Sequence, residues 1–365
     1  MISQKLEDLL NLSLESTPEQ REKSDILNAG FCPQTQTWEL IVKYNGSPEK
    51  LAALGIAAEP LLAGYAVVTV PVQQIPRLAG LEEIEYVEMP KRLFNGLYEA
   101  KRESCILQLT QDTVQERARE TAQQIAKKAG AGQPEADLGL TGEGVLIAVI
   151  DSGIDYWMPD FRGPDGKTRI AWLWDQTLDR VALNRRSAEN REGTEKEPGF
   201  APPEGFLPGV EFSREQIDRA LEAGGREAAF ALVPSQDRSG HGSAVAAIAG
   251  GSNPDPQLRG VAFGAQFLIV KLANPQNGFP GTTELMRAVT WALKKARAMG
   301  RPLAVNLSFG NTYGPHDGSS LPARFLDSAA QYGRNVLCAG SGNEGASFGH
   351  AAGCLQGQRQ VVELA

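Results

Sequence analysis

The stretch that decides the fold is Val145-Leu-Ile-Ala-Val-Ile-Asp151, which is followed at once by Ser152-Gly153. A continuous apolar run of this length predicts a strand that is buried on both faces, as in a parallel sheet. The run ends in a carboxylate, and open α/β sheets place their functional side chains at the carboxyl ends of such strands. We therefore expect Asp151 at the active edge of a mostly parallel sheet. Taken alone, an Asp-Ser-Gly after a strand is more often a simple turn.

A histidine follows further along the chain, in Ser239-Gly240-His241-Gly242-Ser243. Its two glycines allow close packing of the backbone, and the small residues 244–249 behind it predict a helix. A buried aspartate beside a histidine can hold the imidazole tautomer through Nδ1 and leave Nε2 free to act as a general base. A Gly-His-Gly alone means little, but together Asp151 and His241 predict an acid–base pair.

Two further apolar strands end in small and polar residues. One is Val305-Asn306-Leu307-Ser308-Phe309-Gly310, and the other runs from Val336 into the Gly-rich turn Gly342-Asn343-Glu344-Gly345. An asparagine amide at such a turn can donate a hydrogen bond to a developing oxyanion. The sequence therefore indicates Asn343 as a candidate for this role.

In this order, the four segments resemble the subtilisin-like serine peptidases (subtilases) over about residues 142–343. The resemblance implies that Asp151 and His241 are two members of an Asp-His-Ser triad and that Asn343 is the oxyanion donor. It also implies that Ser308-Phe309-Gly310 binds the substrate backbone. The expected fold is an α/β domain with a mostly parallel sheet and helices on both faces. No cofactor and no metal are expected, and the substrate class is a peptide or protein.

The family's nucleophile motif, Gly-Thr-Ser-x-Ala-x-Pro, does not occur between Met1 and Ala365. Ser243 opens the helix two residues after His241, but residues i and i+2 of a helix do not face each other. We therefore expect this chain to be the N-terminal portion of a longer protease, with a C-terminally incomplete sheet. By itself the chain is expected to be inactive, and the missing C-terminal portion of the same protease would be its partner.

A second pattern precedes the parallel sheet. Strands are predicted at 38–44, 57–62, 65–70 and 84–88, with helices at 48–54 and 72–79. This βαββαβ order is that of a small ferredoxin-like α+β domain. Its place in the chain resembles the subtilase prodomain, which assists folding and whose C-terminal tail occupies the active cleft.

The expected organisation has four parts. They are an N-terminal helical segment (1–37), a prodomain-like domain (38–95), a linker (96–137) and a catalytic domain (138–365). Within the last, we expect a surface insertion at about 162–236 that borders the cleft. Its Trp174-Asp-Gln-Thr177 further resembles the spore-germination (Csp-type) subtilases. Cleavage between prodomain and enzyme is expected near 91–105.

Composition limits the remaining function classes. The formal net charge of −8, from 36 basic and 44 acidic residues, argues against nucleic acid or an anionic membrane as the main partner. No apolar stretch approaches the ~20 residues of a membrane span. The acidic, amphipathic start is not that of a secretory signal, and the four scattered cysteines suit reduced thiols. We expect a cytoplasmic or spore-associated protein.

Two rival functions remain at this point. An aspartic protease would need a second Asp-Ser/Thr-Gly, because its two carboxylates share one proton, and the chain has no second copy. The stronger rival is a catalytically inactive pseudoprotease that acts as a binding or regulatory protein, since such members occur among the Csp-type subtilases. The sequence of the downstream reading frame would separate a truncated active protease from such a pseudoprotease.

Overall fold

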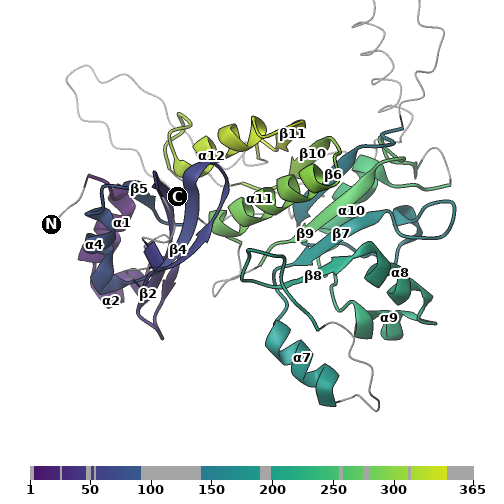
Figure 1. The fold of residues 1–365 in the computed structure, drawn as a ribbon, viewed down its shortest axis with the longest axis horizontal. Coiled ribbons are helices and arrows are strands. Elements are labelled where there is room, and N and C mark those ends of the chain that lie inside the picture. The colour runs from purple at the N-terminus through teal and green to yellow at the C-terminus, as the bar shows by residue number, and fades with distance from the viewer. Residues whose placement is uncertain are drawn as a thin grey trace, which may run out of the picture.

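The computed structural model describes residues 4–24, 27–46, 51–52, 55–91, 141–189, 199–254, 258–273, 280–310 and 314–342. The described residues form a five-stranded sheet and a six-stranded sheet. Figure 1 shows the first in a small N-terminal domain, drawn in purple, beside a larger α/β domain drawn from teal to yellow. The linker predicted at 96–137 lies outside the described residues.

The N-terminal domain is an antiparallel sheet with helices on one face. Its strands are β1 (Phe31–Cys32), β2 (Thr37–Tyr44), β3 (Ala57–Pro60), β4 (Tyr65–Pro71) and β5 (Ile84–Glu88), and its helices are α1 (Asp8–Glu15), α2 (Pro18–Glu22) and α4 (Ile75–Ala79), with short 3₁₀ turns at Leu62–Gly64 and Val72–Gln74. β2 pairs with β4 and β5, and β4 pairs with β3, all antiparallel. The strand order β5-β2-β4-β3 agrees with the expected ferredoxin-like domain. Of the helix predicted at 48–54, only Leu51, Ala52 and residues flanking its end are described.

The segment ahead of residue 38 belongs to the same core. Leu10 of α1 is fully buried among the apolar side chains of the sheet. Phe31 packs on Trp38 with ring centroids 5.1 Å apart, which brings the short strand β1 beside β2. The described part of the segment predicted as helical, 1–37, is therefore not helical throughout: α1 packs on the prodomain-like sheet, and β1 is one of its strands.

The larger domain is built on a sheet of order β11-β10-β6-β9-β7-β8. Its strands are β6 (Leu146–Asp151), β7 (Ile170–Asp175), β8 (Val210–Ser213), β9 (Gln266–Lys271), β10 (Leu303–Leu307) and β11 (Asn335–Ala339). Its helices are α7 (Arg180–Glu189), α8 (Arg214–Glu222), α9 (Arg226–Leu232), α10 (His241–Gly250), α11 (Thr282–Ala298) and α12 (Leu321–Ala330), with a 3₁₀ turn at Pro159–Phe161. All strand pairs are parallel except β7–β8.

Helices cover both faces of this sheet, as expected. Strand side chains alternate between the two faces, so Ala148 and Ile150 of β6 pack with residues of α11 and α12. Ile147 and Val149 of the same strand pack on the opposite face with residues of α8, α9 and α10. Every residue of β6 is buried, which explains why the strand reads as a continuous apolar run. The parallel sheet is thereby the centre of the domain.

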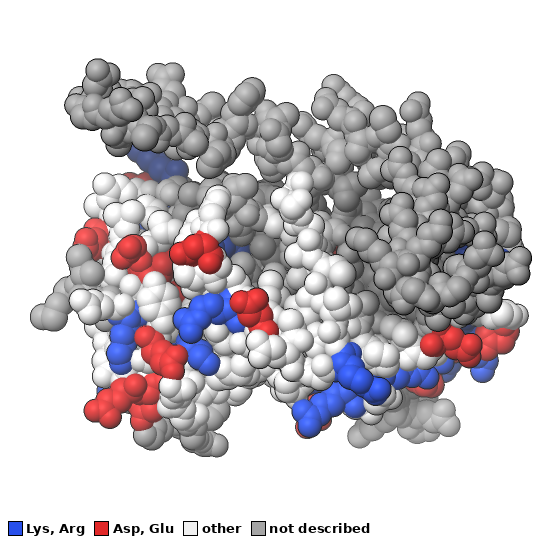
Figure 2. Space-filling model, turned by 90° about the horizontal axis from the view of Figure 1, so that it is seen from above, with Lys and Arg blue, Asp and Glu red and all other residues white. Residues whose placement is uncertain are grey.

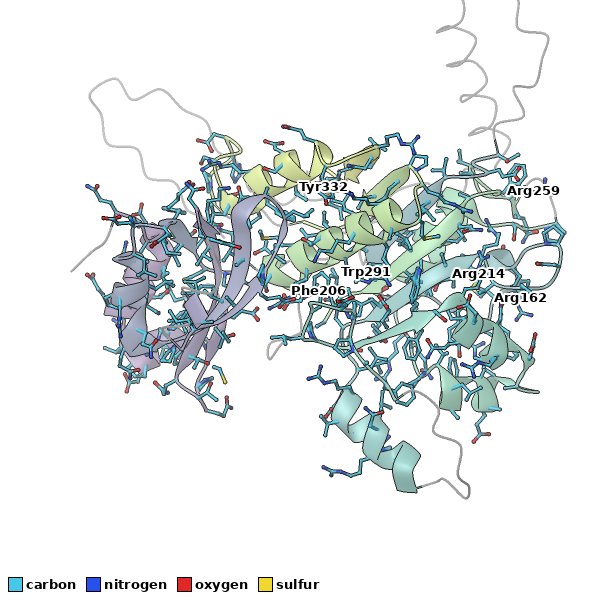
Figure 3. The ribbon with its side chains drawn as sticks, viewed as in Figure 1. Arg162, Phe206, Arg214, Arg259, Trp291 and Tyr332 are labelled. Carbon is cyan, nitrogen blue, oxygen red and sulfur yellow. The ribbon has the colours of Figure 1, made fainter. Side chains whose placement is uncertain are left out.

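The predicted surface insertion at about 162–236 is only partly on the surface, and this corrects the expectation. Its strand β7 pairs with β9, and β8 extends the sheet from β7. Trp174 of β7 is fully buried, with its ring centroid 4.9 Å from that of Phe206 and 5.8 Å from that of Trp291, and Figure 3 labels these two partners. The aromatic contacts explain why a Pro/Gly-rich, charged segment contributes to the core.

The N-terminal domain packs through the second face of its sheet against α11 and α12. Ile41, Tyr65 and Val67 belong to the same apolar cluster as Phe325 of α12. The rings of Tyr65 and Phe325 meet edge to face, 5.6 Å apart. The two domains therefore share this apolar cluster, while each also has a cluster of its own.

The charges on one face of the molecule are mixed in sign. On the face drawn in Figure 2, acidic and basic side chains are interspersed over the described surface rather than gathered by sign. Among the helices that the structure describes, none is both long and apolar enough to cross a bilayer.

Candidate active site

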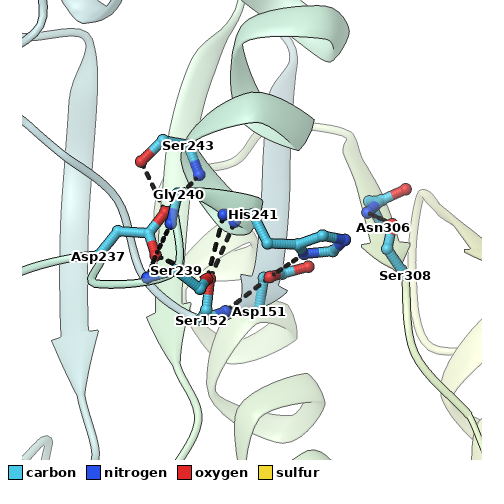
Figure 4. Close-up of polar contacts among 10 residues, drawn as sticks. Asp151, Ser152, Asp237, Ser239, Gly240, His241, Ser243, Asn306 and Ser308 are labelled. Atoms are coloured by element: carbon cyan, nitrogen blue, oxygen red, sulfur yellow. Dashed lines mark hydrogen bonds and ion pairs between the residues drawn. The ribbon is translucent and has the colours of Figure 1, made fainter. Parts of the chain in front are cut away.

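Asp151 and His241 lie next to each other at the carboxyl end of β6. The Nδ1 atom of His241 is 2.5 Å from Oδ1 of Asp151, and the two residues are 6% and 2% exposed. Asp151 ends a parallel strand, and His241 is the first residue of α10, which packs on that strand (Figure 4). A hydrogen bond of this kind orients an imidazole and stabilises its protonated form.

The outer nitrogen of this imidazole has no partner among the described residues. His241 Nε2 is buried and makes no hydrogen bond with them, and the same holds for Asp151 Oδ2. Buried polar atoms are nearly always paired in folded proteins. A nitrogen that is oriented through its ring partner and left open on the other side can accept a proton from an incoming hydroxyl.

Glycines bring the histidine this close to the strand. Gly240 has a left-handed backbone with φ of 74°, which suits glycine. A β-carbon on Gly242 would lie only 2.2 Å from the carbonyl oxygen of Gly153, so the next position also requires glycine. The Gly-His-Gly of the sequence is thus the local condition for seating α10 on the turn after Asp151.

The predicted substrate-binding segment Ser308-Phe309-Gly310 directly follows β10, the neighbour of β6. By strand alternation, Ser308 lies on the same face of the sheet as α10, and its Oγ accepts a hydrogen bond from Nδ2 of Asn306 at 2.7 Å. Figure 4 shows both side chains on the side toward which the imidazole extends. Phe309 is buried in the core of the opposite face, and Gly310 is exposed. Asn343 lies outside the described residues.

One residue of the site, Asp237, was not predicted from the sequence. Its Oδ1 accepts hydrogen bonds from Ser152 Oγ and Gly240 N, each at 2.9 Å, and from Ser239 N at 3.2 Å. Its Oδ2 accepts from the backbone N and the Oγ of Ser243, at 2.9 and 2.7 Å. Asp237 therefore caps the start of α10 from outside the helix. An acidic residue just before a helix start is the signal that could have found it.

The hydrogen bonds decide the ionisation of this side chain. Burial alone would raise the pKa of Asp237, but the bonds from Ser243, Ser152 and Gly240 outweigh it and hold that pKa below 3.8. Because this pKa is lower in the folded state than in the unfolded state, the ionised carboxylate stabilises the fold at pH values above the ordinary pKa of an aspartate. This contribution is lost as the pH falls through the lowered pKa.

The hydroxyl of Ser243 is held in structural hydrogen bonds, which agrees with the prediction that Ser243 is not the nucleophile. Its hydroxyl donates to Oδ2 of Asp237 at 2.7 Å and accepts from the backbone N of Asp155 at 2.8 Å. The hydroxyl is thus engaged both as a donor and as an acceptor. Within the described ranges, no cluster of three or more His, Cys, Asp or Glu side chains could hold a metal ion.

Comparisons with known proteins match both domains. Residues 4–91 match the family model described as the Csp protease B prodomain, and residues 142–359 match that of the subtilase family. Among solved structures, the CspB protease of Clostridium perfringens is 30% identical, with a TM-score of 0.47, over 59% of this chain and 39% of that chain. The comparison with curated proteins gave no match.

Two more solved structures are similar at lower identity. Fervidolysin from Fervidobacterium pennivorans, a keratinolytic enzyme related to subtilisin, is 18% identical with a TM-score of 0.42, over 82% of this chain and 39% of that one. Sphericase is 20% identical with a TM-score of 0.34, over 56% of this chain and 48% of that one. The chain spans less than half the length of each of the three proteins.

Proposed function

Because the chain belongs to the subtilase family and carries a Csp-type prodomain, we propose that it is the N-terminal part of a serine endopeptidase. In this proposal, Asp151 and His241 act with a serine that lies beyond Ala365. The observation that carries the proposal is the buried 2.5 Å contact between Asp151 Oδ1 and His241 Nδ1, together with Nε2 of the same ring, which is buried and makes no hydrogen bond with the described residues.

The chemistry follows from this arrangement. His241 Nε2 takes the hydroxyl proton of the serine while the serine oxygen attacks the peptide carbonyl, and it then gives the proton to the leaving amine. Asp151 stays ionised and stabilises the imidazolium between these steps. Asn343 donates its amide to the oxyanion, and Ser308-Phe309-Gly310 pairs with the substrate backbone.

We assign the N-terminal domain the role of an inhibitory prodomain. Its last described residue, Lys91, accepts a hydrogen bond at its carbonyl from the backbone N of Thr282, 2.7 Å away at the start of α11. Its backbone N donates to Oγ1 of the same threonine at 2.9 Å. Glu88 accepts from the backbone N of Leu321, 2.8 Å away at the start of α12. These bonds fix the end of the N-terminal domain against the starts of α11 and α12. They support a prodomain that is docked on the enzyme at the point where the chain leaves it.

The missing nucleophile can be tested by chemical labelling. A fluorophosphonate probe is expected to label the full-length protein and not the chain Met1–Ala365, because acylation needs the serine that His241 activates. Mass spectrometry of the labelled protein locates the serine, and heat-unfolded protein is the control for non-specific reaction. Stoichiometric labelling of the shorter chain would contradict the proposal.

The oxyanion role is tested by Asn343→Ala in the full-length protein. Loss of one oxyanion donor costs about 10²–10³ in turnover, a figure taken from subtilisin. We expect kcat to fall by this factor with little change in KM, because the donor acts on the transition state. Steady-state kinetics on a peptide substrate measure both, and an unchanged kcat would refute the assignment.

The alternative is a pseudoprotease that binds peptides or regulates a partner. It predicts that the full-length protein is also unlabelled by the probe.

The match to the CspB prodomain supports proposing spore germination as the process, in a cytoplasmic or spore-associated location. Fractionation of germinating spores tests that location.

A further inference from the structure

The carboxylate of Asp237 lies where the two halves of the Asp–His pair meet. Ser152 follows Asp151, and Gly240 precedes His241 in the chain. The hydroxyl of the first and the backbone N of the second both donate to the same oxygen of Asp237, each at 2.9 Å (Figure 4). A single carboxylate oxygen thus connects the immediate neighbours of both members of the pair.

A second bridge strengthens this connection. Ser152 Oγ also accepts a hydrogen bond from the backbone N of Gly242 at 2.9 Å. The turn after β6 and the first turn of α10 are therefore joined by the serine hydroxyl and the Asp237 carboxylate together. These two bridges fix the position of the His241 imidazole, because the backbone of His241 belongs to the first turn of α10.

Asp237 is itself held in place by the two residues before it. The hydroxyl of Ser235, fully buried, donates to Oδ2 of Asp175 at 2.7 Å. The ammonium of Lys271 donates to the carbonyl oxygen of Gln236 at 2.8 Å and lies 3.7 Å from the same Asp175 oxygen. The ends of β7 and β9 thereby fix the segment 235–237.

This contact gives a task to the Trp174-Asp-Gln-Thr177 motif. Asp175 is fully buried and also accepts hydrogen bonds from the backbone N and Oγ1 of Thr177, at 2.9 and 2.6 Å. Between Asp175 and Ser235 the chain passes through α7, β8, α8 and α9. The bond between these two side chains closes the base of the intervening segment, directly ahead of Asp237.

We propose that Asp237 is a positioning residue that sets His241 against Asp151, and that the Asp175–Ser235 bond keeps Asp237 in register. The proposal rests on the proposed function for its effect on turnover, but the geometry it concerns exists without catalysis. Without the carboxylate, Gly240 N, Ser243 N and Ser152 Oγ lose their shared acceptor. The start of α10 can then shift relative to β6.

The test is Asp237→Ala in the full-length protein labelled with ¹⁵N-histidine. The chain has 3 histidines, so the spectrum holds few signals from this part of the protein. In the wild type, the proton between His241 Nδ1 and Asp151 is expected as a far-downfield signal, which H241Q assigns by its absence. In D237A we expect this signal to disappear through exchange with water, and kcat to fall about 10²-fold with nearly unchanged KM, as for a displacement of about 1 Å.

Milder variants keep the test valid should D237A fail to fold. D237N retains an acceptor oxygen for Ser152 and Gly240 and should recover part of the signal and of kcat. S235A removes only the bond to Asp175 and should weaken both in the same direction, by less. The matched control is D218N, since Asp218 is another half-buried carboxylate, whose Oδ1 accepts from Thr168 N at 2.7 Å within the insertion; it should change neither readout.

The outcomes separate the two proposals. An unchanged downfield signal with unchanged kcat in D237A would overturn the positioning role, even if thermal stability fell, because Asp237 would then be only a helix cap. If the wild-type protein has no peptidase activity and D237A still loses the downfield signal, the positioning role is supported and the proposed function is refuted. Equal loss in D218N and D237A would overturn the specificity of the inference.

Discussion

Replacing His241 with alanine in the full-length protein is expected to lower kcat by about 10⁶-fold, as found when the triad histidine of subtilisin is removed. In the proposed function, His241 moves the serine proton, and its Nδ1 lies 2.5 Å from Oδ1 of Asp151. Release of the prodomain by self-cleavage should stop as well. Peptide hydrolysis and the mass of the purified protein measure the two effects.

The matched control for this variant is His316→Ala. His316 is exposed in the loop before α12, so its loss should leave kcat and processing near the wild-type values. Continued self-cleavage by the H241A variant would contradict the assignment of His241. Loss of both activities in H316A as well would point to misfolding rather than to chemistry.

The second large effect is expected for Arg287→Ala, at the contact between the two domains. The guanidinium of Arg287 on α11 donates from Nε to Glu59 and from an Nη atom to Glu39, both at 2.8 Å and both across the domain boundary. It also lies 3.4 Å from Glu284 of its own helix. Removal of one partner from a buried ion cluster costs about 3–5 kcal/mol, because the charges left behind stay unpaired.

The loss should depend on pH in a definite direction. Burial raises the pKa of both Glu59 and Glu284 even beside Arg287, whereas for Glu39 burial is outweighed by that guanidinium, which holds its pKa below 4.5. Without the cation all three carboxyls should bind protons more readily in the folded state than in the unfolded state. Stability of R287A relative to the wild type should therefore rise as the pH is lowered from about 8 to about 5.

Urea unfolding of the full-length protein at several pH values measures this prediction. R297A is the matched control, since Arg297 lies on the same helix but donates to Tyr332 Oη at 2.7 Å on the exposed side; it should change stability by no more than about 0.5 kcal/mol. Adding E39Q and E59Q to R287A removes two of the unpaired charges and should restore part of the loss. A deficit in R287A that does not vary with pH would rule out unpaired carboxylates as its cause.

Local patterns in the sequence contain much of the fold. The period of apolar residues and the turn signals predicted β2 to β5 of the first sheet and β6, β10 and β11 of the second, because burial on one or both faces leaves a direct imprint on neighbouring positions. The order Asp151, then His241, then Ser308 indicated which strand ends and helix would meet. The close approach of Gly242 to Gly153 shows why glycine had to flank the histidine.

Contacts between distant segments could not be obtained in this way. The expected surface insertion became part of the sheet because β7 pairs with β9, and a strand pairing depends on a partner that no local pattern names. Leu10 and Phe31 likewise entered the prodomain core, although their own segment showed mainly helix signals. Asn343 lies outside the described residues, so its predicted role stays a prediction.

By itself, then, the sequence determined the two-domain α/β organisation and the identity of the Asp151–His241 pair, since these rest on periodicity and on motifs of adjacent residues. Only the tertiary structure decided that Asp237 binds Ser152 and Gly240 beside this pair, that Asp175 meets Ser235, and that Arg287 joins the two domains. Each of these is a polar contact between residues that lie far apart in the chain or on different elements. Their energy comes from burial and from the geometry of the partners, and neither exists until the sheets and helices have packed.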